Sequence, residues 1–160
     1  MSNSFKTNLA RILLLLSVVI TGPSINVFGQ NIFGFINIQL ILIFTLRICS
    51  PSTNFKNIWF LSIVSLINDS LTGLIFGTTG ILYLIVLSVA SFQASIKLRS
   101  IFISEWIAFS VAMVLTYTML ILLEYLSGVN FAIAPLVLNY LFTVIAYPLF
   151  WFPISRIIYA

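Results

Sequence analysis

The sequence contains no histidine, one cysteine and only ten charged residues, seven basic and three acidic, among its 160 positions. Without histidine it lacks the commonest general base and a common metal ligand, and Cys49 alone cannot form an internal disulfide or a thiolate metal cluster. Soluble proteins carry about a quarter of their residues as charged side chains, whereas this chain has 6% charged and 61% hydrophobic residues. The composition therefore predicts an integral membrane protein without a metal centre or a cofactor.

The apolar segments are long enough for six membrane crossings, because about 20 residues span a bilayer. The 35 uncharged residues between Arg11 and Arg47 would extend about 52 Å as one helix, so they must fold back, and Gly29-Gln30-Asn31 marks the turn. We expect an all-α polytopic bundle, a single transmembrane domain over residues 1–160. Its expected spans are residues 9–28, 32–48, 58–76, 81–96, 101–126 and 131–152.

The basic residues all fall on one side of these spans. They are Lys6, Arg11, Arg47, Lys56, Lys97, Arg99 and Arg156. Because short loops rich in Lys and Arg stay in the cytoplasm, both termini are expected to be cytoplasmic, with the turns near residues 29, 78 and 128 outside. This distribution explains the net charge of +4 without nucleic-acid binding, and predicts only a modest attraction to anionic membrane lipid.

Two further features bear on this topology. The three tryptophans, Trp59, Trp106 and Trp151, fall at the expected cytoplasmic ends, where indole rings favour the membrane interface. Lys6 and Arg11 before an apolar run are also compatible with a secretory signal peptide, but the run continues to Phe28 and no convincing cleavage site follows. A membrane-spanning first helix is therefore the preferred interpretation.

Asp69 is the one acid expected deep within a span. Glu105 and Glu124 fall near the ends of the fifth span, within reach of water, and we interpret both as interfacial charges. A carboxylate at the depth of Asp69 costs about 2.5–3.5 kcal/mol on insertion scales, and no Lys or Arg has a matching depth. Asp69 is therefore expected to be protonated, hydrogen-bonded within the bundle, reached by water or satisfied by another protein.

Small and polar residues recur every fourth position around Asp69. Ser65, Asp69, Gly73 and Gly77 would share one face of a continuous helix, since residues four apart are neighbours on a helix surface. Small residues at this spacing let helix backbones approach closely. The stripe is therefore expected to be a packing surface, within this fold or against another subunit.

Residues 66–86, LINDSLTGLIFGTTGILYLIV, resemble the central D-x-x-x-G-x-x-x-G segment of the bacterial rod shape-determining protein MreD family. Asp69, Gly73 and Gly77 occupy the motif positions, and the last span, with Asn139 and Pro148, is a weaker similarity. The resemblance implies a non-enzymatic inner-membrane protein of the cell-elongation machinery. It implies MreC, the actin-like MreB and the glycosyltransferase RodA with its penicillin-binding transpeptidase as partners, and a fold similar to the substrate-binding subunits of energy-coupling-factor transporters.

Two other functions remain open. A small-molecule-binding subunit of such a transporter would use an outer pocket, to which Asn68, Asp69, Thr72 and Tyr83 could contribute. The Ala-x-x-x-Ala docking signal usual on the first helix of those subunits is missing, since only Ala10 occurs there. An intramembrane aspartic protease needs two carboxylates that share one site, whereas only Asp69 is deep. We therefore expect a membrane scaffold and no enzymatic activity.

Overall fold

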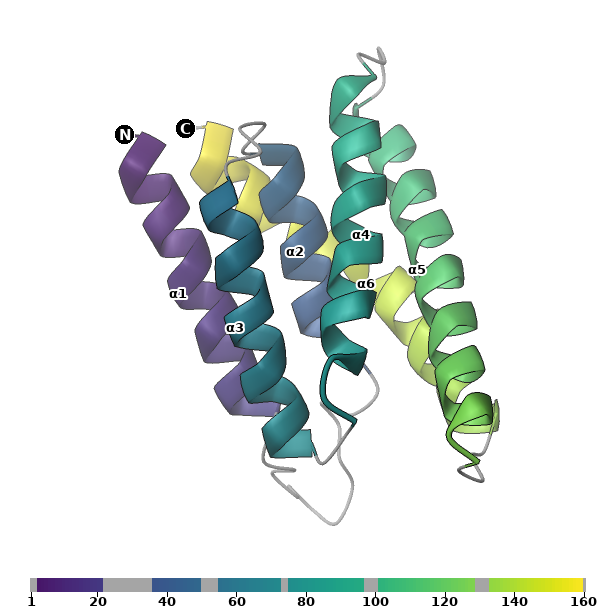
Figure 1. Ribbon diagram of the computed structural model, residues 1–160. Coiled ribbons are helices and arrows are strands. Elements are labelled where there is room, and N and C mark those ends of the chain that lie inside the picture. The colour runs from purple at the N-terminus through teal and green to yellow at the C-terminus, as the bar shows by residue number, and fades with distance from the viewer. Residues whose placement is uncertain are drawn as a thin grey trace, which may run out of the picture.

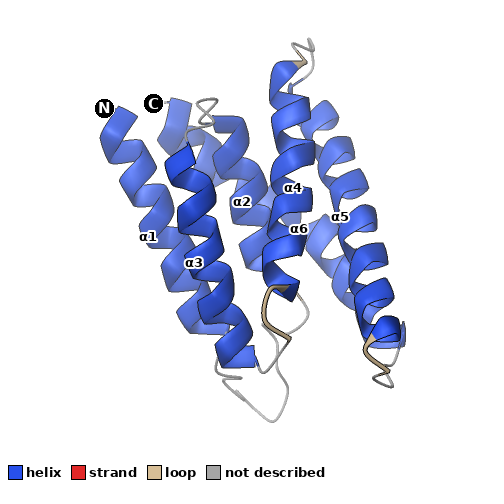
Figure 2. Cartoon of the chain, viewed as in Figure 1, coloured by secondary structure: helices blue, strands red, loops and turns tan. Residues whose placement is uncertain are grey.

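The computed structural model describes residues 3–21, 36–49, 55–72, 75–96, 101–128 and 133–159. Within these ranges the chain is all-α and forms six helices. They are α1 (Asn3–Thr21), α2 (Ile38–Cys49), α3 (Phe55–Thr72), α4 (Thr78–Ser95), α5 (Ile101–Leu126) and α6 (Ile133–Tyr159). Figure 2 shows that helices make up nearly all of the described chain. The expected fold class is thereby confirmed at the level of an all-α bundle.

Successive helices alternate in direction, and the two termini lie at the same end of the bundle (Figure 1). Lys6 in α1, Arg47 in the last turn of α2 and Lys56 at the start of α3 belong to helix segments at this end, which we call the basic end. The expected positions of Lys97 and Arg99 fall outside the described residues. The opposite end contains the turn between α3 and α4, which we call the turn end.

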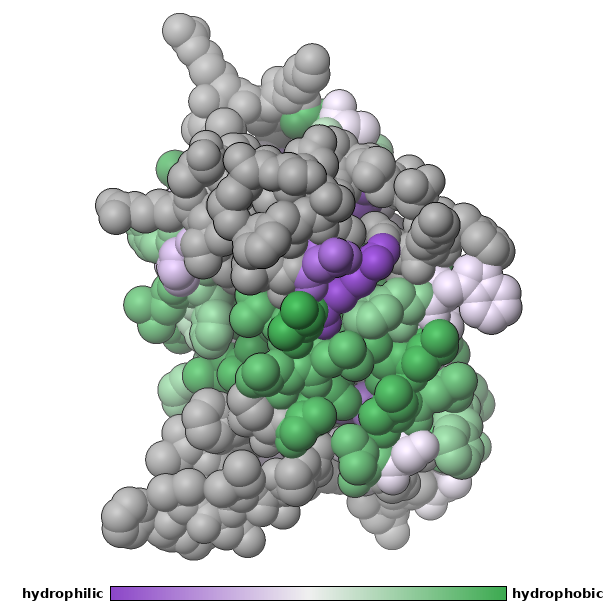
Figure 3. Space-filling view, turned by 90° about the vertical axis from the view of Figure 1, so that its left-hand side faces the viewer, coloured by the Kyte–Doolittle hydropathy of each residue, from purple (hydrophilic) through white to green (hydrophobic). Residues whose placement is uncertain are grey.

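Three of the described helices contain segments that are long and apolar enough to cross a membrane. These segments are Thr78–Ser95, Phe102–Leu123 and Ala134–Pro153, and Ile58–Thr72 of α3 is a shorter apolar segment. On the side shown in Figure 3, apolar side chains cover much of the described surface. Together these helices indicate a multi-pass membrane protein.

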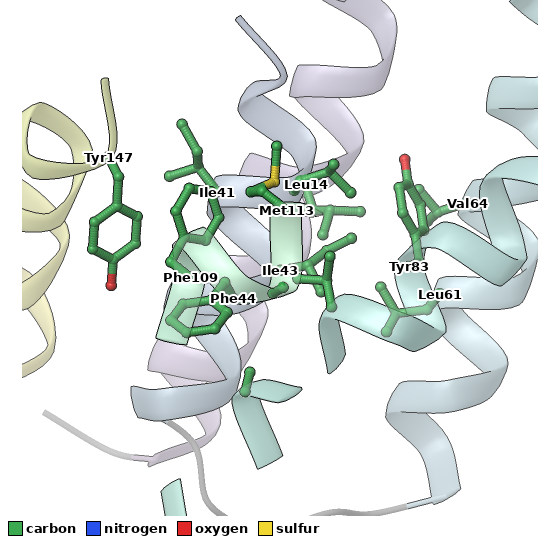
Figure 4. Packing of buried hydrophobic residues seen from close by; sticks show 14 of the residues in the cluster. Leu14, Ile41, Ile43, Phe44, Leu61, Val64, Tyr83, Phe109, Met113 and Tyr147 are labelled. Carbon is green, nitrogen blue, oxygen red and sulfur yellow. The ribbon is translucent and has the colours of Figure 1, made fainter. Parts of the chain in front are cut away.

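Helix α2 lies at the centre of the bundle. Every residue from 39 to 45 is buried, and α2 packs against α1, α4 and α6. A helix that is buried on all sides is typical of a central position. The Phe44 ring lies 5.2 Å from the Phe109 ring of α5 and 5.9 Å from the Tyr147 ring of α6, centroid to centroid. Figure 4 shows these aromatic residues among the aliphatic side chains of the core.

The helix boundaries differ from the expected spans in ways that matter for the site. Helix α5 has the expected bounds of 101–126, but α3 ends at Thr72 rather than at residue 76, and α6 continues through Pro148 to Tyr159. Hydropathy alone cannot separate the apolar residues after Thr72 from the helix before them. The expectation of one continuous helix over 58–76 is therefore wrong.

Helices α1 and α2 are also displaced from their expected spans. Helix α1 begins at Asn3, not at residue 9, and α2 begins at Ile38, not at residue 32. Arg11 lies inside α1, and its guanidinium carbon lies 5.7 Å from the centroid of the Phe60 ring of α3. A cation over an aromatic face is electrostatically favourable, so Arg11 contributes to the contact between α1 and α3.

Candidate functional site

Asp69 lies in the last turn of α3, where its side chain is only 1% exposed. Its Oδ2 accepts a hydrogen bond of 2.7 Å from the backbone N–H of Gly77, and its Oδ1 accepts one of 3.1 Å from the backbone N–H of Thr79. The first N–H groups of a helix have no partner within it, and the positive end of the helix dipole favours an anion there. Asp69 therefore caps the start of α4 from the preceding helix.

The backbone conformation at position 77 favours glycine. Gly77 precedes α4 with φ of 95°, and a Cβ built on it would meet no atom within 4 Å. Residues other than glycine are disfavoured at positive φ because their Cβ atom comes too close to their own backbone. Since residues 75–77 are not helical, Gly77 does not share a helix face with Asp69, and the expectation that it does is wrong. Gly73 lies outside the described residues.

The close helix contact in this region is between Ser65 of α3 and Gly80 of α4. A Cβ on Gly80 would lie 3.1 Å from the Oγ of Ser65, which is tighter than ordinary van der Waals contact. Ser65 is buried, and its hydroxyl donates to the backbone oxygen of Ser62 at 2.8 Å. Ser65, one of the four residues spaced four apart in the sequence, thus packs within the fold, against α4.

Asn68 extends the site toward α2. Its Nδ2 donates to Thr79 Oγ1 at 3.2 Å, and its Oδ1 accepts from Gln39 Nε2 at 3.0 Å. The hydroxyl of Tyr83 donates to Gln39 Oε1. We call Gln39, Asn68, Asp69, Thr79 and Tyr83 the α3–α4 polar cluster; all five are buried and they join three helices. Because buried polar groups are costly unless they are hydrogen-bonded, this network favours one relative placement of α2, α3 and α4.

Thr72 does not belong to this cluster. Its side chain is exposed, and its hydroxyl donates to the backbone oxygen of Asn68 at 2.8 Å. Of the four residues that the sequence suggested for an outer pocket, the other three, Asn68, Asp69 and Tyr83, are gathered in the cluster. Gln39 and Thr79 were missed by sequence reasoning. A polar Gln39 beside the apolar run of α2 was the available signal.

Asn139 belongs to a second polar group, on α6. Its Oδ1 accepts from the hydroxyl of Tyr117 and, at 3.3 Å, from that of Thr143. The backbone N–H of Asn37 donates to Thr143 Oγ1 at 2.9 Å, just before α2 begins. The structure therefore does not bring Asn139 into the α3–α4 polar cluster, and the two groups approach α2 through different residues.

Glu105, interpreted from the sequence as an interfacial charge, is buried where α5 packs against α6. It lies near the start of α5 with 5% of its side chain exposed, and its Oε2 accepts from the indole Nε1 of Trp151 at 2.6 Å. Its burial follows from the packing of α6 against this end of α5. The side chain of Glu124, the other acid interpreted in this way, is outside the part that the structure describes.

Among the described residues, no group of three or more His, Cys, Asp and Glu side chains could hold a metal ion. The chemistry available in the α3–α4 polar cluster is hydrogen bonding by amide, hydroxyl and carboxylate groups. No protein-family model, no curated protein and no solved structure matches this chain.

Proposed function

We propose that this protein is a non-enzymatic scaffold of the bacterial inner membrane, related to MreD, that binds MreC and helps to organise lateral peptidoglycan synthesis. In this proposal all six helices cross the membrane, both termini are cytoplasmic, and the bundle is similar to the substrate-binding subunits of energy-coupling-factor transporters. MreB and RodA with its transpeptidase partner would join through the same complex. The motif resemblance of residues 66–86 motivates the family, and the geometry of α3 supports lateral contact.

The observation that carries the proposal is the division of α3 into two faces. Ser65, Asn68 and Asp69 are buried, whereas Ile63, Ile67 and Leu71 are exposed. The main neighbours of α3 within the described chain are α4 and α1. Because Asp69 and Ser65 are used to hold α4, the exposed apolar face is the part of α3 available to the membrane anchor of another protein. Helices in lipid associate mainly through such van der Waals packing.

An affinity pull-down from detergent-solubilised membranes tests the proposal. The wild-type chain should capture MreC, and the triple variant Ile63→Ala/Ile67→Ala/Leu71→Ala should be made in normal yield but capture much less, because the packing surface is truncated. A matched control is Val137→Ala/Leu141→Ala/Ile145→Ala, which truncates exposed apolar residues of α6 and should capture MreC normally. Failure of the wild-type chain to capture MreC would overturn the proposed function, while equal capture by both variants would overturn only the choice of α3.

The second candidate is a small-molecule-binding subunit of a transporter. The observation in its favour is the α3–α4 polar cluster, which gathers Asn68, Thr79 and Tyr83 in the half of the bundle expected to face outward. A ligand there would have to replace hydrogen bonds that these residues now make with one another. A small molecule co-purifying in stoichiometric amount, or capture of a transporter ATPase module in the same pull-down, would favour this candidate over the scaffold.

A further inference from the structure

At the basic end, Glu105 is a largely buried residue with one carboxylate oxygen bonded to Trp151 and the other open to the surface. Trp151 is its one hydrogen-bond donor within the described chain, through Oε2, and Oε1 has none there. A carboxylate has about four acceptor positions. Asp69, by comparison, uses both of its oxygens on backbone amides. Glu105 therefore retains acceptor capacity for a group that is not part of the described chain.

Aromatic rings surround this region of α5 and α6. The Phe102 ring lies 4.8 Å from Trp151, 6.0 Å from Phe152 and 6.2 Å from Trp106, measured between centroids. We call Phe102, Trp106, Trp151 and Phe152 the aromatic cluster. Trp106 is 37% exposed and Phe152 is 59% exposed, so the cluster reaches the molecular surface. The faces of aromatic rings attract cations, and the carboxylate of Glu105, which is bonded to Trp151 of the cluster, favours the same charge.

The level of Glu105 along α5 indicates where the cation would come from. Glu105 is the fifth residue of α5, about 6 Å from its start at 1.5 Å per residue. Tryptophan is enriched at the level of lipid head groups, and both Trp106 and Trp151 lie here. The geometry thus favours a lipid whose head group carries the cation.

We propose that Glu105 and the aromatic cluster bind a primary ammonium group, supplied by the head group of phosphatidylethanolamine. A primary ammonium has N–H donors, so it forms a charge-assisted hydrogen bond with Oε1 while it lies against the rings. A quaternary ammonium, as in phosphatidylcholine, retains the charge but has no N–H. Free ethanolamine offers the same chemistry without the acyl chains. This inference does not depend on the proposed scaffold function.

Tryptophan quenching by brominated lipids tests the site directly. The protein should carry Trp59→Phe, because Trp59 of α3 is outside the aromatic cluster; the remaining indoles, Trp106 and Trp151, then report on it. The vesicles consist of phosphatidylglycerol with a small fraction of brominated lipid. Brominated phosphatidylethanolamine should half-quench the tryptophan fluorescence at a mole fraction about fivefold lower than brominated phosphatidylcholine needs. Each methyl group added to the head-group nitrogen removes one N–H donor, so stepwise N-methylation of the lipid should weaken the quenching progressively. This series uses the Trp59→Phe protein without further substitutions.

The decisive variant is Glu105→Gln, which keeps an oxygen for Trp151 but removes the charge. It should abolish the preference for ethanolamine lipid, whereas Glu124→Gln, the same change at the other end of α5, should leave the preference intact. Relief of quenching by millimolar ethanolamine would support the ammonium site and assign it to the free amine. Equal quenching by the two lipids, or a preference that survives Glu105→Gln, would overturn the proposal.

Discussion

At the scale of single residues, Asp69 shows how an acid can be buried with backbone amides, and no basic side chain of the described residues, as its partners. Each carboxylate oxygen accepts from one amide at the start of α4, and the positive end of the α4 dipole lies at the same place. The carboxylate thus satisfies two N–H groups that would otherwise have no acceptor. Its burial cost is offset locally, within the turn that joins α3 to α4.

We predict that Asp69→Asn destabilises the protein less than Asp69→Leu. Asparagine keeps one acceptor oxygen but turns an NH₂ group toward the second amide, so we expect a loss of about 1–2 kcal/mol. Leucine leaves both buried amides unpaired and should cost about 2–4 kcal/mol. Unfolding in mixed micelles with increasing SDS measures both, and Ser70→Ala, at the exposed neighbouring position, is the control. Wild-type stability of Asp69→Leu would show that the cap is dispensable.

Sequence reasoning identified Asp69 because charge is so scarce in this chain, but it could not identify its partners. Backbone amides are present at every position except proline, and only the turn geometry makes those of Gly77 and Thr79 available. Gly77 was assigned to packing because it follows Asp69 by eight residues, which assumes an unbroken helix. Its φ of 95° instead puts it outside a right-handed helix, at the N-cap of α4.

At the scale of helices, α3 and α4 approach most closely where Ser65 meets Gly80. We predict that Gly80→Ala destabilises the hairpin slightly, because its Cβ would lie 3.1 Å from Ser65 Oγ. Ser65→Ala should relieve this conflict, since a Cβ on Gly80 would lie 3.7 Å from the Ser65 Cβ, an ordinary contact. The double variant should therefore be more stable than Gly80→Ala alone by about 0.5–1 kcal/mol, which a double-mutant cycle in mixed micelles measures. Additive effects would mean that the two positions do not interact.

The pair α5–α6 is joined by two indole hydrogen bonds that run in opposite directions. Trp106 of α5 donates to the backbone oxygen of Val144 at 3.0 Å, and Trp151 of α6 donates to Glu105. Pro148 lacks the N–H that would normally bond to the oxygen of Val144, four residues earlier. The indole of Trp106 replaces that donor. The indole thus compensates for the donor that Pro148 lacks, in a helix that continues through this proline to Tyr159.

We predict that Trp106→Phe costs about 1–2 kcal/mol in the wild-type chain and about 1 kcal/mol less in a Pro148→Ala background. Alanine at 148 supplies the missing N–H, so the oxygen of Val144 no longer needs the indole. The loss of ring packing is the same in both backgrounds and cancels in the comparison. Trp151→Phe is the matched control and should show no such dependence, because Trp151 bonds to Glu105. Equal costs of Trp106→Phe in the two backgrounds would contradict the proposed replacement.

At the scale of the whole molecule, polar and charged groups are divided between the two ends of the bundle. The α3–α4 polar cluster lies toward the turn end, while the termini and the segments that carry Lys6, Arg47 and Lys56 lie at the basic end. The alternation of six helices and this sidedness could be predicted from hydropathy and charge. The hydrogen-bonded contacts between helices could not, because they depend on helix rotation and on where each helix ends.

We predict that the basic end of the bundle faces the cytoplasm and the turn end faces outward. In a Cys49→Ser background, Ser127→Cys at the turn after α5 and Ser95→Cys at the end of α4 place single thiols at exposed positions near opposite ends of the bundle. Because basic segments stay in the cytoplasm, a membrane-impermeant maleimide should label Ser127→Cys in intact cells and Ser95→Cys only after permeabilisation. The reverse pattern would invert the topology and place the α3–α4 polar cluster in the cytoplasmic half. Labelling of both thiols in intact cells would mean that α5, which connects the two ends, does not cross the membrane.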